Sequence, residues 1–291
     1  MQRGTSPSTG TAGIAVAVRG TGAPVLVLHG TPGGIRAADV MGRFLPSDRF
    51  RVVTLSRPGY TGTSLLPEHA SLDDEADRYA ALLDRLGIDR VAVLAWSGGG
   101  PVAYRFAVRH PHRVRALAVA AGLSARWVPP EPSPAEWVVA HTTFGAAAAA
   151  LAARLVPAVV VRTAEAGVSS LRGRDLSTHV AEVLRDRARR RVVIDLSTSG
   201  NAAGRNRPGW DNDVRVLGAV DDLDLGAVTA PTLLVHGDAD TAVPLEHSVR
   251  AAAAVPDAEL VTLRGGTHFG LWDHRDAAAV QERVRVHLER D

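Results

Sequence analysis

The sequence predicts an α/β fold, in which a mostly parallel central sheet carries helices on both faces and a helical cap is inserted. Three observations predict it: short apolar runs rich in β-branched residues, amphipathic segments between them, and one long interruption of this alternation. Most apolar runs are continuous, as is typical of parallel strands covered on both faces. Strands are expected at residues 14–18, 25–29, 51–55, 91–95, 116–120, 232–236 and 259–263, and amphipathic helices at 72–86, 99–110, 246–254 and 275–289.

The alternation is interrupted between residues 123 and 208. This segment holds the tandem Pro129 and Pro130, an alanine-rich helical run at 145–155, an arginine-rich helix around 184–191 and a polar stretch at 197–207. We interpret residues 123–208 as a helical cap inserted into a core formed by residues 1–122 and 209–291. The arginine run is interpreted as a solvated helix face rather than as a site for an anionic partner.

Composition excludes several classes of protein. Lys and Arg together number 33 against 31 Asp and Glu, so the net charge of +2 gives no indication of nucleic-acid or anionic membrane binding. Since no cysteine is present, disulfides, a thiol nucleophile and Cys-ligated metal are excluded. The N-terminal residues lack the apolar region of a secretory signal. The most apolar stretch, residues 146–161, is interrupted by Arg154 and Pro157 and is shorter than the ~20 residues of a membrane span. We expect a cytoplasmic protein and leave open a homo-oligomer.

Residues 91–100 read Val-Ala-Val-Leu-Ala-Trp-Ser-Gly-Gly-Gly, a strand that runs through Ser97 into a helical pattern. A tight strand-to-helix turn lifts a serine clear of a sheet, and small residues such as Ala95 and Gly99 let strand and helix approach there. The turn also places Ser97 at a helix N-terminus, where the N–H of Gly98 is a natural donor to an oxyanion. Alternatives are a structural helix cap and a phosphate-binding loop, although no lysine follows to complete the latter.

A second turn, His29-Gly30-Thr31-Pro32-Gly33-Gly34, follows the strand expected at 25–29. The proline and glycines suit a sharp turn at the carboxyl end of a strand. We expect the N–H of Thr31 to be the second oxyanion donor. His29 is a candidate base, but bracing of the loop by hydrogen bonds is the favoured interpretation.

Two further post-strand loops carry the partners that a serine nucleophile needs. Asp238 and Asp240 follow the strand at 232–236, and Asp240 lies far enough beyond it to orient a base, whereas Asp238 suits a turn-stabilising role. His268 follows the strand at 259–263 after two glycines and is the candidate base. Ser97, Asp240 and His268 are therefore the predicted catalytic residues.

These motifs resemble the α/β-hydrolase superfamily in its serine-nucleophile branch with a helical cap, over nearly the whole chain. The matching segments are residues 29–33, 57–64, the turn at Ser97, 237–244 and the late His268, in the chain order serine, acid, histidine. The resemblance implies acylation of Ser97, with His268 as base and Asp240 orienting it, and hydrolysis of the acyl-enzyme by water. It implies no cofactor and no metal.

The cap is expected to select a small-molecule substrate. Trp127, Trp137 and Phe144, with Trp96 and Phe269 beside the catalytic residues, are candidate pocket residues, although core packing explains each equally well. A small or medium apolar carboxylic ester or lactone is the first expectation. Prolyl-aminopeptidase-like activity and C–C bond hydrolysis use the same triad and remain alternatives. A ligand receptor or a biosynthetic cyclase or lyase on this scaffold is the alternative of another class.

Overall fold

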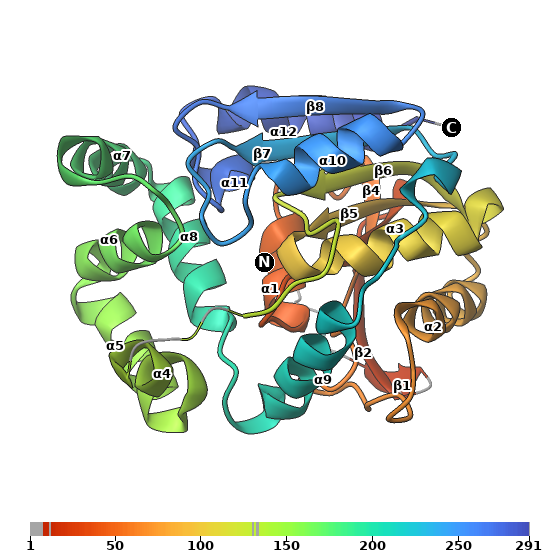
Figure 1. Cartoon of the computed structure of the whole chain (residues 1–291), viewed down its shortest axis with the longest axis horizontal. Helices are drawn as coiled ribbons and strands as arrows, with labels where there is room; N and C mark the ends of the chain where they lie inside the picture. The colour runs from red at the N-terminus through yellow and green to blue at the C-terminus, as the bar shows by residue number, and fades with distance from the viewer. Residues whose placement is uncertain (1–7, 12, 130, 132–133, 291) are drawn as a thin grey trace.

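The computed structural model describes residues 8–11, 13–129, 131 and 134–290 (Figure 1). Pro130 and residues 1–7, for which no secretory signal is expected, lie outside the described residues. Eight strands form one sheet in the order β1-β2-β4-β3-β5-β6-β7-β8. Their bounds are β1 Ser8–Thr11, β2 Ile14–Arg19, β3 Ala23–Leu28, β4 Phe50–Leu55, β5 Val91–Trp96, β6 Val114–Ala120, β7 Thr232–Gly237 and β8 Ala258–Leu263. The pairs β1–β2 and β2–β4 are antiparallel and the other neighbours are parallel, so the predicted fold class is confirmed.

Strand β1 is the one strand of the described chain that the sequence pattern did not predict. It pairs antiparallel with β2 at the edge of the sheet, where Ser8 lies opposite Val16. An edge strand needs only backbone hydrogen bonds to one neighbour, so its residues carry no apolar run that a pattern could reveal.

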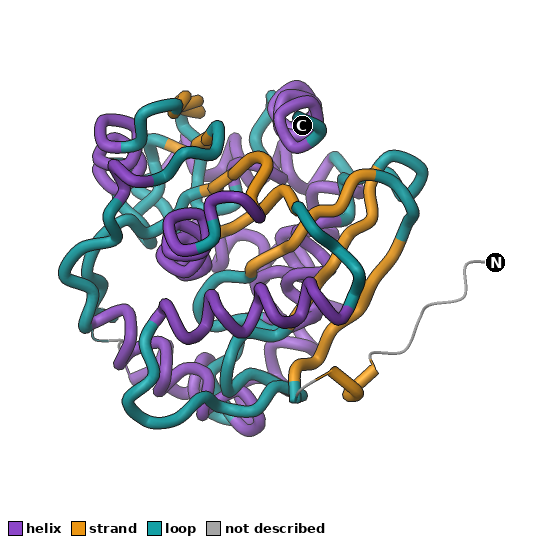
Figure 2. Tube along the Cα trace, turned by 90° about the vertical axis from the view of Figure 1, so that its right-hand side faces the viewer, coloured by secondary structure: helices purple, strands orange, loops and turns teal. Residues whose placement is uncertain are grey.

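Helices cover both faces of the sheet (Figure 2). One face packs against α2, α3 and α10, and the other against α1, α11 and α12. These helices are α1 Ile35–Gly42, α2 Leu72–Arg85, α3 Gly100–Arg109, α10 Glu246–Ala254, α11 Gly270–Asp273 and α12 Ala277–Leu288. Helix α2 begins at a capping box, in which the Ser71 side chain accepts from the N–H of Asp74 and the Asp74 side chain accepts from the N–H of Ser71.

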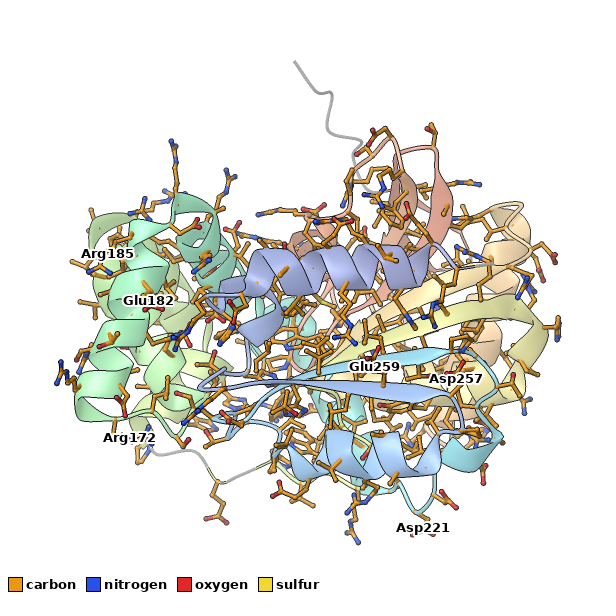
Figure 3. All side chains as sticks on the ribbon, turned by 90° about the horizontal axis from the view of Figure 1, so that it is seen from above. Arg172, Glu182, Arg185, Asp221, Asp257 and Glu259 are labelled. Atoms are coloured by element: carbon orange, nitrogen blue, oxygen red, sulfur yellow. The ribbon has the colours of Figure 1, made fainter. Side chains whose placement is uncertain are left out.

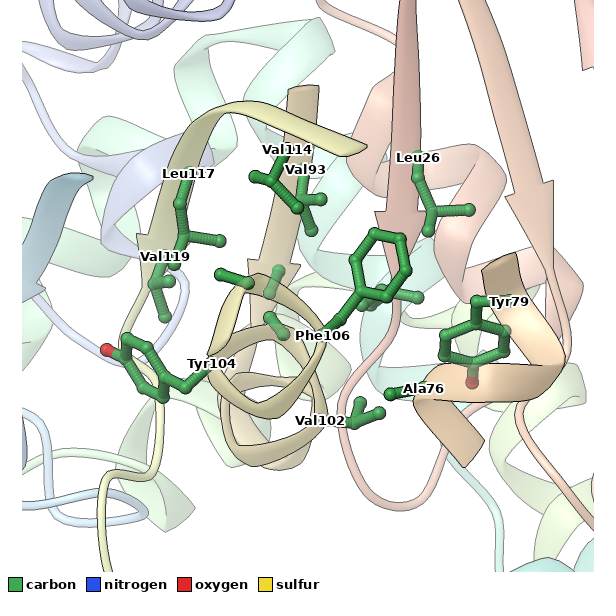
Figure 4. Packing of buried hydrophobic residues seen from close by; sticks show 14 of the residues in the cluster. Leu26, Ala76, Tyr79, Val93, Val102, Tyr104, Phe106, Val114, Leu117 and Val119 are labelled. Atoms are coloured by element: carbon green, nitrogen blue, oxygen red, sulfur yellow. The ribbon is translucent and has the colours of Figure 1, made fainter. Parts of the chain in front are cut away.

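The interior of the first face shows how the core holds the site in place (Figure 4). Val102 and Phe106 of α3, Tyr79 of α2, and Leu26 and Val93 of the central strands are buried in one apolar cluster. Burying a side chain of this size contributes about 1.5–3 kcal/mol, so α3 is held firmly against β5. The turn between β5 and α3, which contains Ser97, is therefore anchored on both sides.

Among the described residues, six α-helices lie between β6 and β7: α4 Pro134–His141, α5 Thr143–Leu155, α6 Pro157–Gly167, α7 Gly173–Arg185, α8 Arg187–Ser199 and α9 Arg207–Gly218. Helices α4 to α8 form a group beyond the carboxyl ends of the parallel strands (Figure 1), the edge at which open α/β sheets bind ligands. Helix α9 contains the boundary expected between residues 208 and 209, and its Val216 and Leu217 pack into the core. The division into core and cap remains a prediction.

One helix expected in this segment is divided. The arginine-rich stretch at 184–191 was expected to be a single helix, but α7 ends at Arg185 and α8 begins at Arg187. Asp186 between them is extended, and its side chain accepts from the N–H groups of Ala188 and Arg189. Asp186 thus caps the start of a second helix within the arginine-rich stretch that was expected to be one helix. Helix α8 also continues to Ser199, into the polar stretch expected at 197–207.

Candidate active site

Ser97 lies directly after β5, as the first residue of a 3-10 turn (Ser97–Gly99) that leads into α3. Its φ of 54° is in the left-handed region, which residues with a side chain rarely adopt and which marks a strained turn. A Cβ added to Gly30 would lie 2.8 Å from the Cβ of Ser97, so only glycine lets the neighbouring turn approach this closely. The structure therefore has the strand-to-helix turn that the sequence predicts.

The turn after β3 brings Thr31 against Gly98. A Cβ added to Gly98 would lie 2.3 Å from Thr31 Oγ1 and 3.2 Å from the backbone nitrogen of Thr31. Gly98 is in the first turn of a helix, where backbone N–H groups have no intrahelical acceptor. The backbone nitrogens of Thr31 and Gly98 thus lie close together beside Ser97, in an arrangement suited to binding an oxyanion.

His29 braces this turn and is not among the residues that line the cavity at Ser97. Its Nε2 accepts from the N–H of Arg57 at 2.9 Å and its Nδ1 donates to the carbonyl of Gly30 at 2.7 Å. Burial, followed by the nearby Arg57 guanidinium, lowers the pKa of His29 to about 3. The side chain is a neutral imidazole with both nitrogens in use, in line with the favoured interpretation.

Asp240 and His268 form a close pair at the ends of β7 and β8. His268 Nδ1 lies 2.7 Å from Asp240 Oδ2, and Asp240 Oδ1 accepts from the N–H groups of Ala242 at 2.8 Å and Val243 at 3.0 Å. Burial alone would raise the pKa of Asp240, but His268, His236 and the N–H of Val243 lower it to about 2. The carboxylate is therefore charged at neutral pH and can hold a neighbouring imidazole in one tautomer.

Two residues brace this pair. His236 Nε2 lies 3.3 Å from Asp240 Oδ2 and donates to the carbonyl of Val243 at 2.8 Å. Asp238 Oδ1 accepts from the N–H of Gly265 at 2.6 Å and so ties the two loops together. Sequence analysis assigned Asp238 a turn-stabilising role but missed His236, whose position at a strand end four residues before Asp240 was the available signal.

Ser97, Gly98, Thr31 and His268 line one cavity of about 680 Å³. Most of its remaining lining residues are apolar or small; they are Pro32, Trp96, Leu123, Arg126, Trp127, Val128, Ala164, Gly167, Val168, Leu196, Ser197, Gly200, Thr241, Ala242, Val243, Pro244, His247 and Phe269. The cavity thus draws on the strand-end loops and on helices α6 and α8. Its volume suits a small or medium organic molecule.

Three of the five candidate pocket residues, Trp96, Trp127 and Phe269, line this cavity. Trp96 also donates from Nε1 to the carbonyl of His268 at 3.1 Å and so supports the histidine loop from the side of the nucleophile. Trp137 and Phe144 are not among the lining residues, and they are 48% and 76% exposed. Helical patterning shows that a residue is apolar but not which face of its helix the rest of the fold covers.

Arg57, Glu75 and Asp213 form a buried ionic cluster that the sequence did not predict. Arg57 Nε donates to Glu75 at 2.9 Å, and its two terminal nitrogens donate to Asp213 at 3.1 and 2.9 Å. Thr31 Oγ1 donates to Asp213 Oδ2 at 2.5 Å, which links the cluster to the candidate oxyanion donor. Asp213 lies 156 residues from Arg57, so no local pattern could have paired them.

Comparison with known proteins decides the family. Residues 23–275 match the family described as alpha/beta hydrolase fold. The chain belongs to this family. An alpha/beta hydrolase fold protein from Nakamurella multipartita is 39% identical and superposes with a TM-score of 0.93 over 98% of both chains.

Named relatives differ in their reactions. A pimeloyl-[acyl-carrier protein] methyl ester esterase of Aromatoleum aromaticum is 33% identical over 88% of this chain and 95% of its own. A 2-hydroxy-6-oxononadienedioate/2-hydroxy-6-oxononatrienedioate hydrolase of Pseudomonas putida is 27% identical over 87% of this chain and 83% of its own. The alpha/beta hydrolase described here is therefore a hydrolase whose relatives act on different bonds. Among the described residues, no helix is both long and apolar enough to cross a membrane.

Proposed function

We propose that this chain is a serine hydrolase that forms an acyl-enzyme at Ser97 and acts on a small or medium apolar carboxylic ester or lactone. The observation that carries the proposal is one cavity lined by Ser97 and by His268, whose other ring nitrogen is held 2.7 Å from the buried carboxylate of Asp240. Nucleophile, base and orienting acid come from three different strand ends and converge at one place.

In the proposed reaction His268 takes the hydroxyl proton as Ser97 Oγ attacks the carbonyl carbon, and the negative charge moves to the carbonyl oxygen. The N–H groups of Thr31 and Gly98 stabilise that charge. The carbon–oxygen bond to the leaving group then breaks, and the alcohol departs with the proton from His268. A water molecule gives a proton to His268 and attacks the acyl carbon; the bond from that carbon to Ser97 Oγ then breaks, the acid is released, and His268 returns the proton to Oγ.

The cavity supports the substrate class. Its lining includes Trp127, Val128, Val168 and Leu196, which give an apolar acyl group surface against which to be buried. Relatives named as esterases act on carboxylic esters in agreement with this choice.

The test is labelling by a fluorophosphonate probe together with turnover of p-nitrophenyl butyrate. Ser97→Ala should lose labelling, and His268→Ala should lose turnover by about 10³-fold or more. Ser197→Ala is the matched control, because Ser197 lines the same cavity but donates its hydroxyl to the carbonyl of Val193 at 2.7 Å. Labelling of Ser97→Ala at the wild-type rate would overturn the proposal. Tight ligand binding without labelling or turnover would instead favour the receptor or cyclase alternative.

Hydrolysis of a C–C bond next to a ketone is the second candidate function, and one observation favours it. Arg126 and His247 line the cavity that contains Ser97, so a cation and an imidazole are available to a substrate carboxylate. The Pseudomonas putida relative is named for a reaction on a dioate, a substrate that carries such groups. A 2-hydroxy-6-oxo-dienoate probe separates the two: if C–C hydrolysis is the main reaction, Arg126→Ala should raise KM for the dienoate at least tenfold and leave p-nitrophenyl butyrate unaffected.

A further inference from the structure

A second cluster of ionisable side chains lies apart from the candidate active site. Glu165 of α6, His179 of α7 and Asp273 of α11 come together where the inserted helices meet the core. The carboxyl groups of Glu165 and Asp273 are fully buried, and the His179 side chain is only 10% exposed. None of the three lines the cavity that contains Ser97.

Three of the four carboxyl oxygens of this cluster lack a hydrogen-bond donor. Among the described residues, four buried side-chain atoms have no hydrogen-bond partner, and three of them are Glu165 Oε1, Glu165 Oε2 and Asp273 Oδ1. Leaving buried polar atoms unpaired costs roughly 1–3 kcal/mol each, and more for charged groups. Native proteins resolve such a deficit by protonation, by ordered water or by a bound cation, and a cation can satisfy several carboxylate oxygens at once.

The spacing of the three side chains fits a metal ion better than a hydrogen-bonded ion pair. His179 Nε2 lies 3.3 Å from Glu165 Oε2 and 3.3 Å from Asp273 Oδ2. Charge-assisted N–H···O bonds are about 2.7–2.9 Å long, so both contacts are too long for a strong one. Ligand atoms arranged tetrahedrally at about 2.0–2.2 Å from a Zn²⁺ ion lie about 3.3–3.6 Å from one another, which matches both separations.

We propose that Glu165, His179 and Asp273 form a binding site for a divalent transition-metal cation, with Zn²⁺ as the best match. One imidazole and two carboxylates are ligand types that Zn²⁺ accepts, and with the imidazole neutral their charge of −2 balances the ion. Three protein ligands leave a fourth coordination position for water. The site is independent of the proposed hydrolysis at Ser97.

One side chain of the cluster, His179, borders a second cavity. This cavity of about 1040 Å³ is also lined by Glu182 of α7 and loop residues such as Asp238 and Arg264. Glu182 lies on α7 between Arg172 and Arg185 (Figure 3). A hydrated ion can therefore reach His179 without passing the candidate active site.

The position of the site indicates what the ion does. Asp273 Oδ2 also accepts from Thr267 Oγ1 at 3.3 Å, and Thr267 directly precedes His268. Glu165 and His179 belong to two inserted helices, so an ion shared with Asp273 ties those helices to the core beside the histidine loop. Bound Zn²⁺ is expected to stabilise the native chain as a whole, since it binds the folded state and not the separated ligands.

The experiment measures metal binding itself. Full-length protein, stripped with a chelator and dialysed, is titrated with Zn²⁺ by calorimetry, and the bound metal is counted by elemental analysis. One equivalent per chain is expected. At a free Zn²⁺ concentration about 100 times Kd, the unfolding equilibrium should shift about a hundredfold toward the native state. Co²⁺ should give visible absorption bands typical of four-coordinate cobalt, a readout that needs no variant.

Matched variants locate the ion. Glu165→Gln and Asp273→Asn keep the shape of each side chain and should weaken Zn²⁺ binding at least tenfold. Glu182→Gln is the control, because it removes a carboxylate from the neighbouring cavity outside the cluster and should leave binding unchanged. A Zn²⁺ stoichiometry well below one per chain, or equal Zn²⁺ binding by wild type and Glu165→Gln, would overturn the proposal. The three side chains would then be held together by shared protons and hydrogen bonds alone. If Asp273→Asn fails to fold, Glu165→Gln and the cobalt spectrum still decide.

Discussion

Two buried clusters of charged side chains each join elements that are distant in the chain, and they differ in the donors that face their carboxylates. In the first, Glu75 and Asp213 share the guanidinium of Arg57, which offers five N–H donors. The hydroxyls of Tyr60 and Tyr79 add a donor to Asp213 and to Glu75, respectively. In the second, Glu165 and Asp273 share the imidazole of His179, which offers only one nitrogen to both.

Two carboxylates can be buried together at low cost only when enough hydrogen-bond donors are buried with them. Burial alone would lower the pKa of Arg57, but the carboxylates of Asp213 and Glu75 raise it well above the ordinary value. The first cluster is thus complete within the protein chain. The second has unpaired oxygens, which a bound cation would satisfy.

The largest effect is expected from breaking the complete cluster. Arg57→Ala leaves the Glu75 and Asp213 carboxylates buried without their shared cation and should lower the free energy of unfolding by about 3–5 kcal/mol. Urea unfolding monitored by circular dichroism measures the loss. Arg49→Ala is the control, because its ion pair with Glu289 is partly exposed and screened by solvent and should contribute far less. Equal losses in the two variants would show that the buried cluster contributes no more than a surface pair.

The next experiment compares the two clusters directly through isosteric removal of one carboxylate charge from each. Asp213→Asn places an amide where Arg57 and Tyr60 both donate, and it should cost about 3 kcal/mol of unfolding free energy. Glu165→Gln, measured with a chelator present, replaces a buried carboxyl group neither of whose oxygens has a hydrogen-bond donor, and it should leave the free energy of unfolding unchanged or raise it. A large loss in Glu165→Gln under chelation would show that the second cluster is already complete.

The pH dependence of stability isolates His29, which lies beside Arg57. The pKa of His29 is about 3 in the folded chain and 6.5 in the reference state, so only the unfolded chain takes up this proton between those values. Its contribution to stability is therefore fully present above pH 6.5 and is lost as pH falls. We expect a loss of about 2 kcal/mol from pH 7.5 to pH 5. Urea unfolding across this range should show a shallower pH dependence in His29→Gln than in wild type, and parallel curves would contradict the assigned pKa.

Much of the fold and of the candidate site could be predicted because local signals encode them. The apolar run before Ser97, the small residues around it and the glycine turns before Asp240 and His268 are read within about ten residues of sequence. The structure brings Ser97 and His268 to one cavity and Asp240 to His268. Strand order was not predicted, because β4 lies between β2 and β3 in the sheet and the succession of apolar runs along the chain does not indicate that exchange.

The rest depends on partners distant in the chain. No local pattern in the sequence indicates that Glu165 is buried beside His179 and Asp273. Likewise, no local pattern indicates that Asp213 pairs with Arg57. Exposure of Trp137 and Phe144 likewise depends on what packs on α4 and α5, which helical periodicity does not specify. Sequence patterns therefore predict catalytic residues on turns better than they predict buried polar contacts between elements that are distant in the chain.

The smallest expected effect tests whether the complete cluster also serves the candidate oxyanion site. Thr31→Val keeps the side-chain shape but removes the hydroxyl that donates to Asp213 Oδ2, so unfolding should become easier by about 1 kcal/mol. The variant keeps the backbone N–H of Thr31, but the turn that orients this N–H loses its hydrogen bond to Asp213 of α9. Turnover of p-nitrophenyl butyrate should therefore fall several-fold in kcat with KM nearly constant, because an oxyanion donor acts on the transition state rather than on the bound substrate. Thr31→Ser restores the hydroxyl and should restore kcat. A rise in KM alone would show that Thr31 contacts substrate instead of supporting the oxyanion donor.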